Sequence, residues 1–232
     1  MAGEVRPAVI LHTESSVGFG GQEIRVLAES RWLAAHGRRP LIAAQPGAPI
    51  LGEARRAGIP AVEVTMRAAW DLRAFAALRR VIRTRAVDLV HTHSSVDAWV
   101  AGLAARSLGV PVVRSRHVSI PIRRPGALVY RLANRVITSG EAVAAIVRAA
   151  GVPSARVVAI APGVDTTRFH PSVSGVGVRA ELGLQGPAVG LVANIRGSKG
   201  HAYFLEAARL VLRERADARF LIVGDGIGFD DV

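Results

Sequence analysis

The chain has 232 residues, half of them hydrophobic, so it is long enough for one or two domains with a buried core. It has no cysteine, which excludes disulfide bonds and thiolate metal ligands. Its formal charge of +12 comes with a single lysine, Lys199, among 30 basic residues, and aromatic residues make up only 5% of the chain. Charge alone therefore favours a solvated arginine-rich surface, and nucleic-acid binding is not expected.

The sequence shows no uninterrupted apolar run long enough to span a membrane and no signal-peptide pattern at its start. We therefore expect a cytoplasmic protein. The basic surface also favours peripheral contact with the anionic inner face of the membrane.

Short apolar or β-branched runs alternate with helical patterns, which predicts an α/β fold with a parallel sheet covered on both faces. The predicted strands of the first part are 8–12, 40–44, 61–65, 87–91, 110–114, 135–138 and 156–160. Apolar stripes of two helices are expected to face this sheet: Ile24, Leu27, Ala28 and Trp32 in the first, Leu72, Phe75 and Ala76 in the third.

The pattern breaks between 162 and 186, a stretch rich in glycine, proline and hydroxyl residues. The chain is therefore divided into a first domain at 1–170, a linker at 171–186 and the start of a second domain at 187–232. The second part predicts strands at 188–193 and 219–223, and between them a helix at 201–215 with Phe204, Ala207 and Val211 on one face. A doubly wound lobe usually needs roughly 100 to 150 residues, so we expect this second lobe to be incomplete.

The turn after the first strand is rich in glycine, and Gly20 and Gly21 precede the expected start of a helix. Backbone N–H groups there can approach an anion or a sugar at the positive end of the helix, although a tight turn without ligand fits as well. His91 and His93 end the fourth strand on one face, where open parallel sheets place ligand-contacting side chains. No cluster of further acidic or histidine ligands is evident near them, so a polar pocket or a satisfied core histidine is favoured over a metal site.

Two further loops carry candidate binding residues. His117 follows the fifth strand, where a neutral imidazole can donate a hydrogen bond to a sugar hydroxyl or a phosphate oxygen. In the second part, Arg196, Lys199 and Gly200 lie between a strand and a helix, where two cations and a helix N-terminus would neutralise a diphosphate. Solvated side chains are the alternative reading of both loops.

These motifs, in this order, resemble the retaining glycosyltransferases of family 4, which have two Rossmann-like lobes in the GT-B fold. The segments that carry the resemblance are 20–23, 88–93, 111–117, 161–171, 192–200 and 221–226. The resemblance implies a complete acceptor-side lobe and a truncated donor-side lobe. It also implies transfer of a sugar with retention from a UDP- or GDP-sugar to a saccharide or lipid-linked acceptor, as in cell-envelope polysaccharide or lipopolysaccharide synthesis.

The resemblance also assigns roles. His117 would contact the transferred sugar as the catalytic residue, Arg196, Lys199 and Gly200 would bind the diphosphate, and Gly20 and Gly21 would lie near phosphate and acceptor. His91 and His93 would lie near the acceptor, and Gly224, Asp225 and Gly226 near the nucleotide. No cofactor or metal is implied.

The chain departs from the family pattern in two places. Asn194 stands where the family commonly has an arginine, so phosphate neutralisation would fall to Arg196. The paired glutamates of the donor lobe would lie beyond Val232. A non-catalytic acceptor-binding fragment and a sugar-nucleotide epimerase of the same fold are therefore the alternatives.

Overall fold

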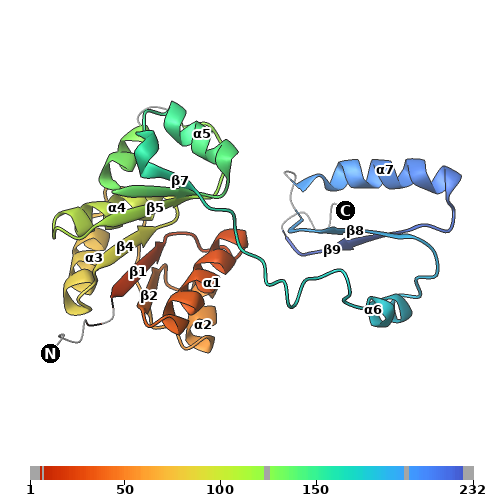
Figure 1. The fold of residues 1–232 in the computed structure, drawn as a ribbon, viewed down its shortest axis with the longest axis horizontal. Helices are drawn as coiled ribbons and strands as arrows, with labels where there is room; N and C mark the ends of the chain where they lie inside the picture. Colours follow the sequence, from red (N-terminus) through yellow and green to blue (C-terminus); the bar gives the residue numbers. More distant parts are fainter. Residues whose placement is uncertain (1–5, 7, 123–125, 196–198, 227–232) are drawn as a thin grey trace. The chain divides into compact units, whose positions relative to one another are not determined.

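The computed structural model describes residues 6, 8–122, 126–195 and 199–226. The chain divides into two compact units, Met1–Gly163 and Val164–Val232 (Figure 1). None of the helices in the described ranges is long and apolar enough to cross a membrane.

The first unit is built on a seven-stranded sheet in the order β3-β2-β1-β4-β5-β6-β7. All neighbouring strands pair in parallel, which confirms the predicted α/β class. The strands are β1 Val9–Glu14, β2 Arg39–Ala44, β3 Ala61–Glu63, β4 Leu89–Thr92, β5 Val112–Arg116, β6 Arg135–Thr138 and β7 Val157–Ala159. Each lies within two residues of its predicted position, because a short apolar run bounded by turns marks a buried parallel strand clearly.

Helices connect these strands on both faces of the sheet (Figure 1). The α-helices are α1 Gly21–Ala35, α2 Pro49–Arg56, α3 Leu72–Thr84, α4 Ser95–Arg106 and α5 Glu141–Ala149, and the 3-10 helices are η1 Gly126–Leu132 and η2 Ser154–Arg156. The larger core packs α3, α4 and α5 against one face of the sheet, around Leu11, Leu78 and Val136. A smaller core packs α1 and α2 against the other face, around Leu27 and Ile42.

The predicted apolar stripe of α1 is wrong except for Leu27, which is buried. Ile24 and Trp32 are 56% and 60% exposed, and the buried face of the helix contains Val26 and Ser30 beside Leu27. The apolar residues of α1 are spaced so that either of two helix faces could be buried. The face that is buried covers polar side chains of the sheet edge.

The predicted stripe of α3 is also wrong in part, since of its three residues only Phe75 packs against the core. The helix buries Ala74, Leu78 and Ile82, whereas Leu72 is 80% exposed at its first position. Asp71 caps this helix by accepting hydrogen bonds from the backbone N–H groups of residues 73 and 74, each at 3.0 Å. The cap fixes where the helix begins and so places Leu72 outside its buried face.

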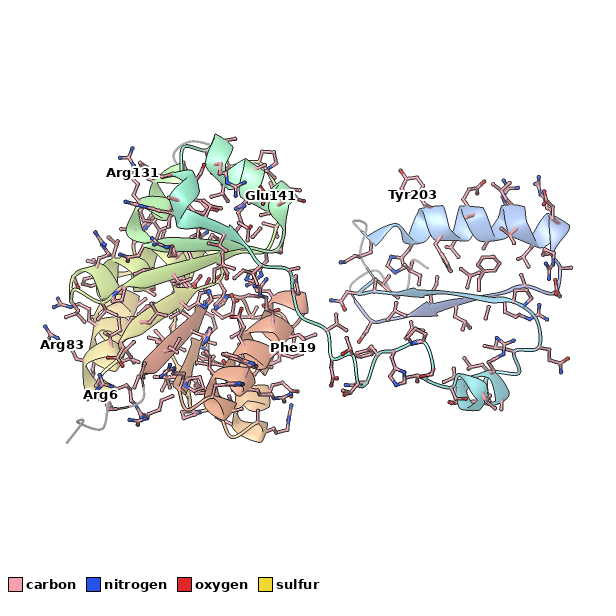
Figure 2. The ribbon with its side chains drawn as sticks, in the orientation of Figure 1. Arg6, Phe19, Arg83, Arg131, Glu141 and Tyr203 are labelled. Carbon is pink, nitrogen blue, oxygen red and sulfur yellow. The ribbon has the colours of Figure 1, made fainter. Side chains whose placement is uncertain are left out.

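The second unit contains two parallel strands, β8 Ala188–Val192 and β9 Arg219–Val223, joined through helix α7 His201–Glu214. Phe204 packs on Phe220 with ring centroids 5.7 Å apart, as the predicted helix face requires, but Ala208 is buried in place of Ala207. Tyr203 points away from the strands (Figure 2). A short helix, α6 Val176–Glu181, falls within the stretch predicted as a linker.

Gly224 ends β9 where two backbone segments meet. The backbone N–H of Ala193 donates to the carbonyl of Val223 at 3.0 Å, and that of Ile195 donates to the carbonyl of Asp225 at 3.0 Å. A Cβ added to Gly224 would overlap the carbonyl oxygen of Ala193. Close backbone approach therefore requires glycine here, whatever ligand lies nearby.

Candidate functional site

Polar side chains gather where three neighbouring strands of the large sheet end. His12 of β1 and His91 of β4 are direct register partners. His93 and His117 follow β4 and β5, which pair with each other. Because parallel strands end at one edge, the topology brings together four histidines from distant parts of the sequence.

The four imidazole rings form one continuous cluster. The His91 and His93 centroids are 4.2 Å apart, which confirms that both side chains lie on one face. His12 Nδ1 and His93 Nε2 are 3.0 Å apart, and His93 Nδ1 and His117 Nε2 are 3.3 Å apart, so hydrogen bonds link three rings in a row. His91 Nε2 lies 2.8 Å from the hydroxyl oxygen of Ser115.

Burial keeps these histidines neutral. Desolvation lowers the pKa of His12 to about 4, and it holds the pKa values of His91 and His93 well below the ordinary value. The pKa of His117 is lowered to about 4 by burial and by the charges of Arg25 and Arg114. At neutral pH the cluster therefore offers imidazole donors and acceptors without positive charge.

Two buried carboxyl groups lie beside the cluster. Asp97 on α4 accepts hydrogen bonds from Thr13 Oγ1 at 2.8 Å, the His93 backbone N–H at 2.9 Å and Ser94 Oγ at 2.6 Å. Glu14 at the end of β1 accepts from the Ser16 backbone N–H at 2.9 Å and from the side chain of Gln22. These bonds fasten the ends of β1 and β4 to the loops that follow.

Both carboxyl groups hold their protons more tightly than usual. Burial, and next the charge of Asp97, raise the pKa of Glu14 to about 7. Burial also raises the pKa of Asp97, against the hydrogen bonds it accepts. A proton on Glu14 near neutral pH makes the edge of the sheet less negative.

The glycine-rich turn forms as predicted at the start of α1. Gly20 is the N-cap, and its backbone N–H donates to Glu23 Oε2 at 2.8 Å. Ser15 and Ser94 hydroxyl oxygens lie 2.5 Å apart and join this turn to the loop after β4. Phe19, 38% exposed, lies beside the start of the helix (Figure 2). The positive end of α1 thus opens at the same edge as the histidines.

Buried basic side chains complete this edge. Arg25 of α1 is only 8% exposed, and its Nε lies 3.2 Å from Glu29 Oε1. Arg114 of β5 donates to the Ser94 carbonyl at 3.0 Å, and its guanidinium carbon lies 4.8 Å from the ring centroid of Tyr130.

The structure corrects one expectation about His91 and His93. His12 and Glu29 stand beside them, and one ligand atom from each of the four lies within 4.8 Å of all the others. The expected absence of further histidine or acidic ligands near the pair is therefore wrong. Glu14, Arg25 and Asp97 were also not singled out.

A signal for some of these residues was present in the sequence. The first strand ends in His12, Thr13 and Glu14 after an apolar run, and all three are buried. Polar residues at the carboxyl end of a central strand indicate a site. Glu29 gives no such signal, because it lies within α1 and comes near the histidines only when this helix packs on the sheet.

The predicted residues of the second unit lie near the start of α7 and the end of β9. Lys199 is exposed, and Gly200 is the N-cap of α7 with φ 78°, a left-handed conformation that favours glycine. Arg196 lies outside the described residues. Gly224, Asp225 and Gly226 are exposed, and their nearness to a nucleotide stays a prediction.

The sequence pattern of Glycosyltransferase Family 4 matches residues 19–168. The chain belongs to this family. The match covers well over half of the chain, and it includes the glycine turn, His91, His93 and His117. The predicted family membership is thereby confirmed.

Two curated proteins that are named glycosyltransferases are similar to this chain. The chain is 31% identical over 160 residues to a D-inositol 3-phosphate glycosyltransferase of Streptomyces scabiei, covering 61% of this chain and 36% of that protein. It is 27% identical over 180 residues to the UDP-Gal:alpha-D-GlcNAc-diphosphoundecaprenol alpha-1,3-galactosyltransferase of Escherichia coli, covering 70% of this chain and 46% of the other. The chain thus spans less than half the length of these two relatives.

A solved structure that contains a nucleotide sugar has the same fold. HepE of Anabaena, determined in complex with UDP-glucose, matches with a TM-score of 0.79 and 19% identity, over 96% of this chain and 62% of that one. This chain therefore has a fold of the predicted GT-B type.

Proposed function

We propose that the chain forms the acceptor-side lobe and the opening of the donor-side lobe of a glycosyltransferase. The reaction is transfer of a sugar, with retention, from a UDP- or GDP-sugar to a saccharide or lipid-linked acceptor. The observation that carries this proposal is that residues 19–168 match the family and contain the glycine turn and three of the four clustered histidines. The galactosyltransferase of E. coli, whose name gives a UDP-sugar donor and a lipid-linked acceptor, supports it.

The clustered side chains define roles on the acceptor side. His117 is the histidine of the cluster that is only partly buried, and its neutral imidazole would hydrogen bond to the transferred sugar. His93 contacts its ring at 3.3 Å, and His91 and His93 would lie near the acceptor. Gly20 and Gly21 at the positive end of α1 would receive a phosphate or hydroxyl of the substrates.

On the donor side, Arg196, Lys199 and the N-terminus of α7 would neutralise the diphosphate. Lys199 is exposed next to the first turn of α7, which supports this role. A departing nucleoside diphosphate gains charge in the transition state, and fixed cations with a helix N-terminus can stabilise it. The transfer itself would then need no metal ion or cofactor.

The test separates donor binding from transfer. The 232-residue chain is titrated with UDP and GDP by calorimetry, and it is then assayed for donor hydrolysis and for transfer to inositol phosphate and lipid-diphosphate saccharides. Lys199→Ala should weaken nucleotide binding about tenfold or more, since it removes a charge-assisted contact. Arg213→Ala, an exposed cation near the other end of α7, is the matched control and should leave binding unchanged.

The outcomes distinguish the readings. Nucleotide binding with transfer supports the proposal, and His117→Ala should then reduce turnover by about 100-fold. Nucleotide binding without transfer supports the non-catalytic fragment. Interconversion of UDP-sugars without an acceptor would support an epimerase, and absence of any nucleotide binding contradicts the donor site.

We also propose a cytoplasmic location with peripheral contact at an anionic membrane surface. Trp70 and Leu72 are 83% and 80% exposed between β3 and α3, and Leu103 of α4 is 42% exposed. They border an apolar hollow of about 450 Å³ together with Phe75 and Arg106. Large apolar side chains gathered at the surface indicate an interaction site.

Charge around this hollow favours anionic lipid. Arg106 lines it, and Arg67 and Arg73 lie within two residues of lining residues in the sequence. Asp71, the acidic residue among its lining side chains, is occupied as the cap of α3. An exposed indole with nearby arginines suits the boundary between lipid headgroups and acyl chains.

A further inference from the structure

Four side chains of the first unit form a group of metal-ligand type. His12, Glu29, His91 and His93 each offer one ligand atom, and these atoms all lie within 4.8 Å of one another. The three histidines are buried and Glu29 is half-buried. Three imidazoles and one carboxylate are a ligand set that binds zinc.

The hydrogen bonds within the group leave one ring incomplete. A neutral imidazole ring has one N–H and one bare nitrogen. The single contact between His12 and His93 uses Nδ1 of His12. Nε2 of His12 is buried and has no hydrogen-bond partner, and His12 is only 1% exposed. The nitrogen of His12 that faces His93 is Nδ1, so the unpartnered Nε2 is the outer nitrogen of this ring and is not the ligand atom.

Partners outside the group fix two of the rings. His91 uses Nε2 to contact Ser115, which leaves Nδ1 facing Glu29, whose Oε2 lies 3.8 Å away. His93 uses Nδ1 to contact His117, which leaves Nε2 facing His12. Metal-bound histidines are typically held in this way, with the outer nitrogen hydrogen bonded and the inner nitrogen free to coordinate.

A neighbouring cation has to be accounted for. Arg25 lowers the pKa values of His91 and His93 through its charge, so it lies close enough to repel an ion. Its Nε, however, lies 3.2 Å from Glu29 Oε1, whereas Oε2 faces His91. Oε1 of Glu29 can therefore pair with Arg25 while Oε2 coordinates the metal.

We propose that His12, His91, His93 and Glu29 bind one zinc ion inside the first unit. The ion would join β1, β4 and α1, and it would lie beside His117, whose ring contacts His93. Zinc binding is measured without sugar transfer, so either proposal can fail alone. The inner nitrogens of a tetrahedral zinc site lie about 3.3 Å apart. The 3.0 Å between His12 Nδ1 and His93 Nε2 is near that value, and the 3.8 Å between His91 Nδ1 and Glu29 Oε2 has to close by about 0.5 Å, which side-chain rotation of half-buried Glu29 can supply.

The first experiment uses the unaltered 232-residue chain. It is stripped of metal with a chelator, and zinc is titrated in competition with a chromophoric chelator. We expect one ion per chain, a raised melting temperature of the first unit that the chelator reverses, and visible absorption of tetrahedral type when cobalt(II) replaces zinc. Less than one equivalent bound at micromolar free zinc, or an octahedral cobalt spectrum, would overturn the proposal.

Variants then locate the ion. His12→Gln and His93→Gln should each weaken zinc binding by more than about 100-fold, and Ser115→Ala, which frees the outer nitrogen of His91, by about tenfold. The control is the double variant His36→Gln and His170→Gln, which removes two exposed histidines and should bind as the unaltered chain does. Equal binding by a folded His93→Gln chain contradicts the site. Should the buried variants unfold, the cobalt spectrum and Ser115→Ala decide.

Discussion

Replacing Glu14 by glutamine tests the electrostatics of the sheet edge directly. The side chain is 1% exposed, and its pKa is raised to about 7 by burial and by the charge of Asp97. Glutamine keeps the shape, still accepts from the Ser16 backbone N–H, and can face Gln22 once that amide turns over. The substitution therefore removes a titrating charge with little change in packing.

The expected effect follows from proton linkage. In the folded chain Glu14 keeps its proton up to about pH 7, whereas in the unfolded chain it releases the proton near 4.5. Between these values the folded state binds more protons, so the free energy of unfolding falls as the pH rises. The free energy of unfolding decreases by about 1.4 kcal/mol per pH unit, or about 3 kcal/mol over the window. The glutamine variant lacks this decrease, because its side chain does not titrate.

Tryptophan fluorescence during urea unfolding provides the assay. Trp32, Trp70 and Trp99 all belong to the first unit, so the signal reports on this unit alone. The stability of Glu14→Gln relative to the unaltered chain should increase by about 3 kcal/mol between pH 5 and pH 8. Glu181→Gln, which removes an exposed carboxylate of α6, is the control. A Glu14→Gln difference that stays flat across this range refutes the reasoning.

Three further predictions follow from packing and exposure. Gly224→Ala should destabilise the second unit by about 1–3 kcal/mol, because the added Cβ would overlap backbone atoms. Gly190→Ala is the control, because its Cβ would enter open space. Hydrogen exchange of peptides from β8 and β9 measures the stability of the second unit in both variants. Trp70→Ala should weaken sedimentation with anionic vesicles about tenfold, and Trp32→Ala, also exposed, should not. Asp97→Ala should cost about 2–4 kcal/mol of stability in the fluorescence assay, because it leaves buried donors unpaired, and a loss below 1 kcal/mol contradicts this.

Sequence patterns were sufficient for the strands of this fold. Every strand lies within two residues of its prediction, and the ranges 135–138 and 219–223 agree at both ends. Buried parallel strands are short apolar runs bounded by turns, so each one can be recognised without its neighbours. Strand order and the pairing of His12 with His91 are properties of the whole sheet, and no local pattern contains them.

The candidate site was predicted only where its residues end strands. His91 lies near the end of β4, His93 and His117 follow β4 and β5, and the structure brings the three into one cluster. Glu29 enters the cluster through the orientation of α1. That orientation depends on which helix face is buried, and the face predicted for α1 was wrong.

One physical cause accounts for both the wrong face of α1 and the missed polar residues. The helix buries Glu23, Arg25 and Ser30 while Ile24 and Trp32 are exposed, the reverse of an ordinary amphipathic helix. Its inner face covers the sheet edge where imidazoles and carboxyl groups are buried, so charge pairing and hydrogen bonds decide the fit there. A rule that turns apolar residues inward fails at such a place, because the chain gives up apolar burial to hold polar groups. The failure itself therefore indicates a functional site, and it does so at the same edge as the histidines.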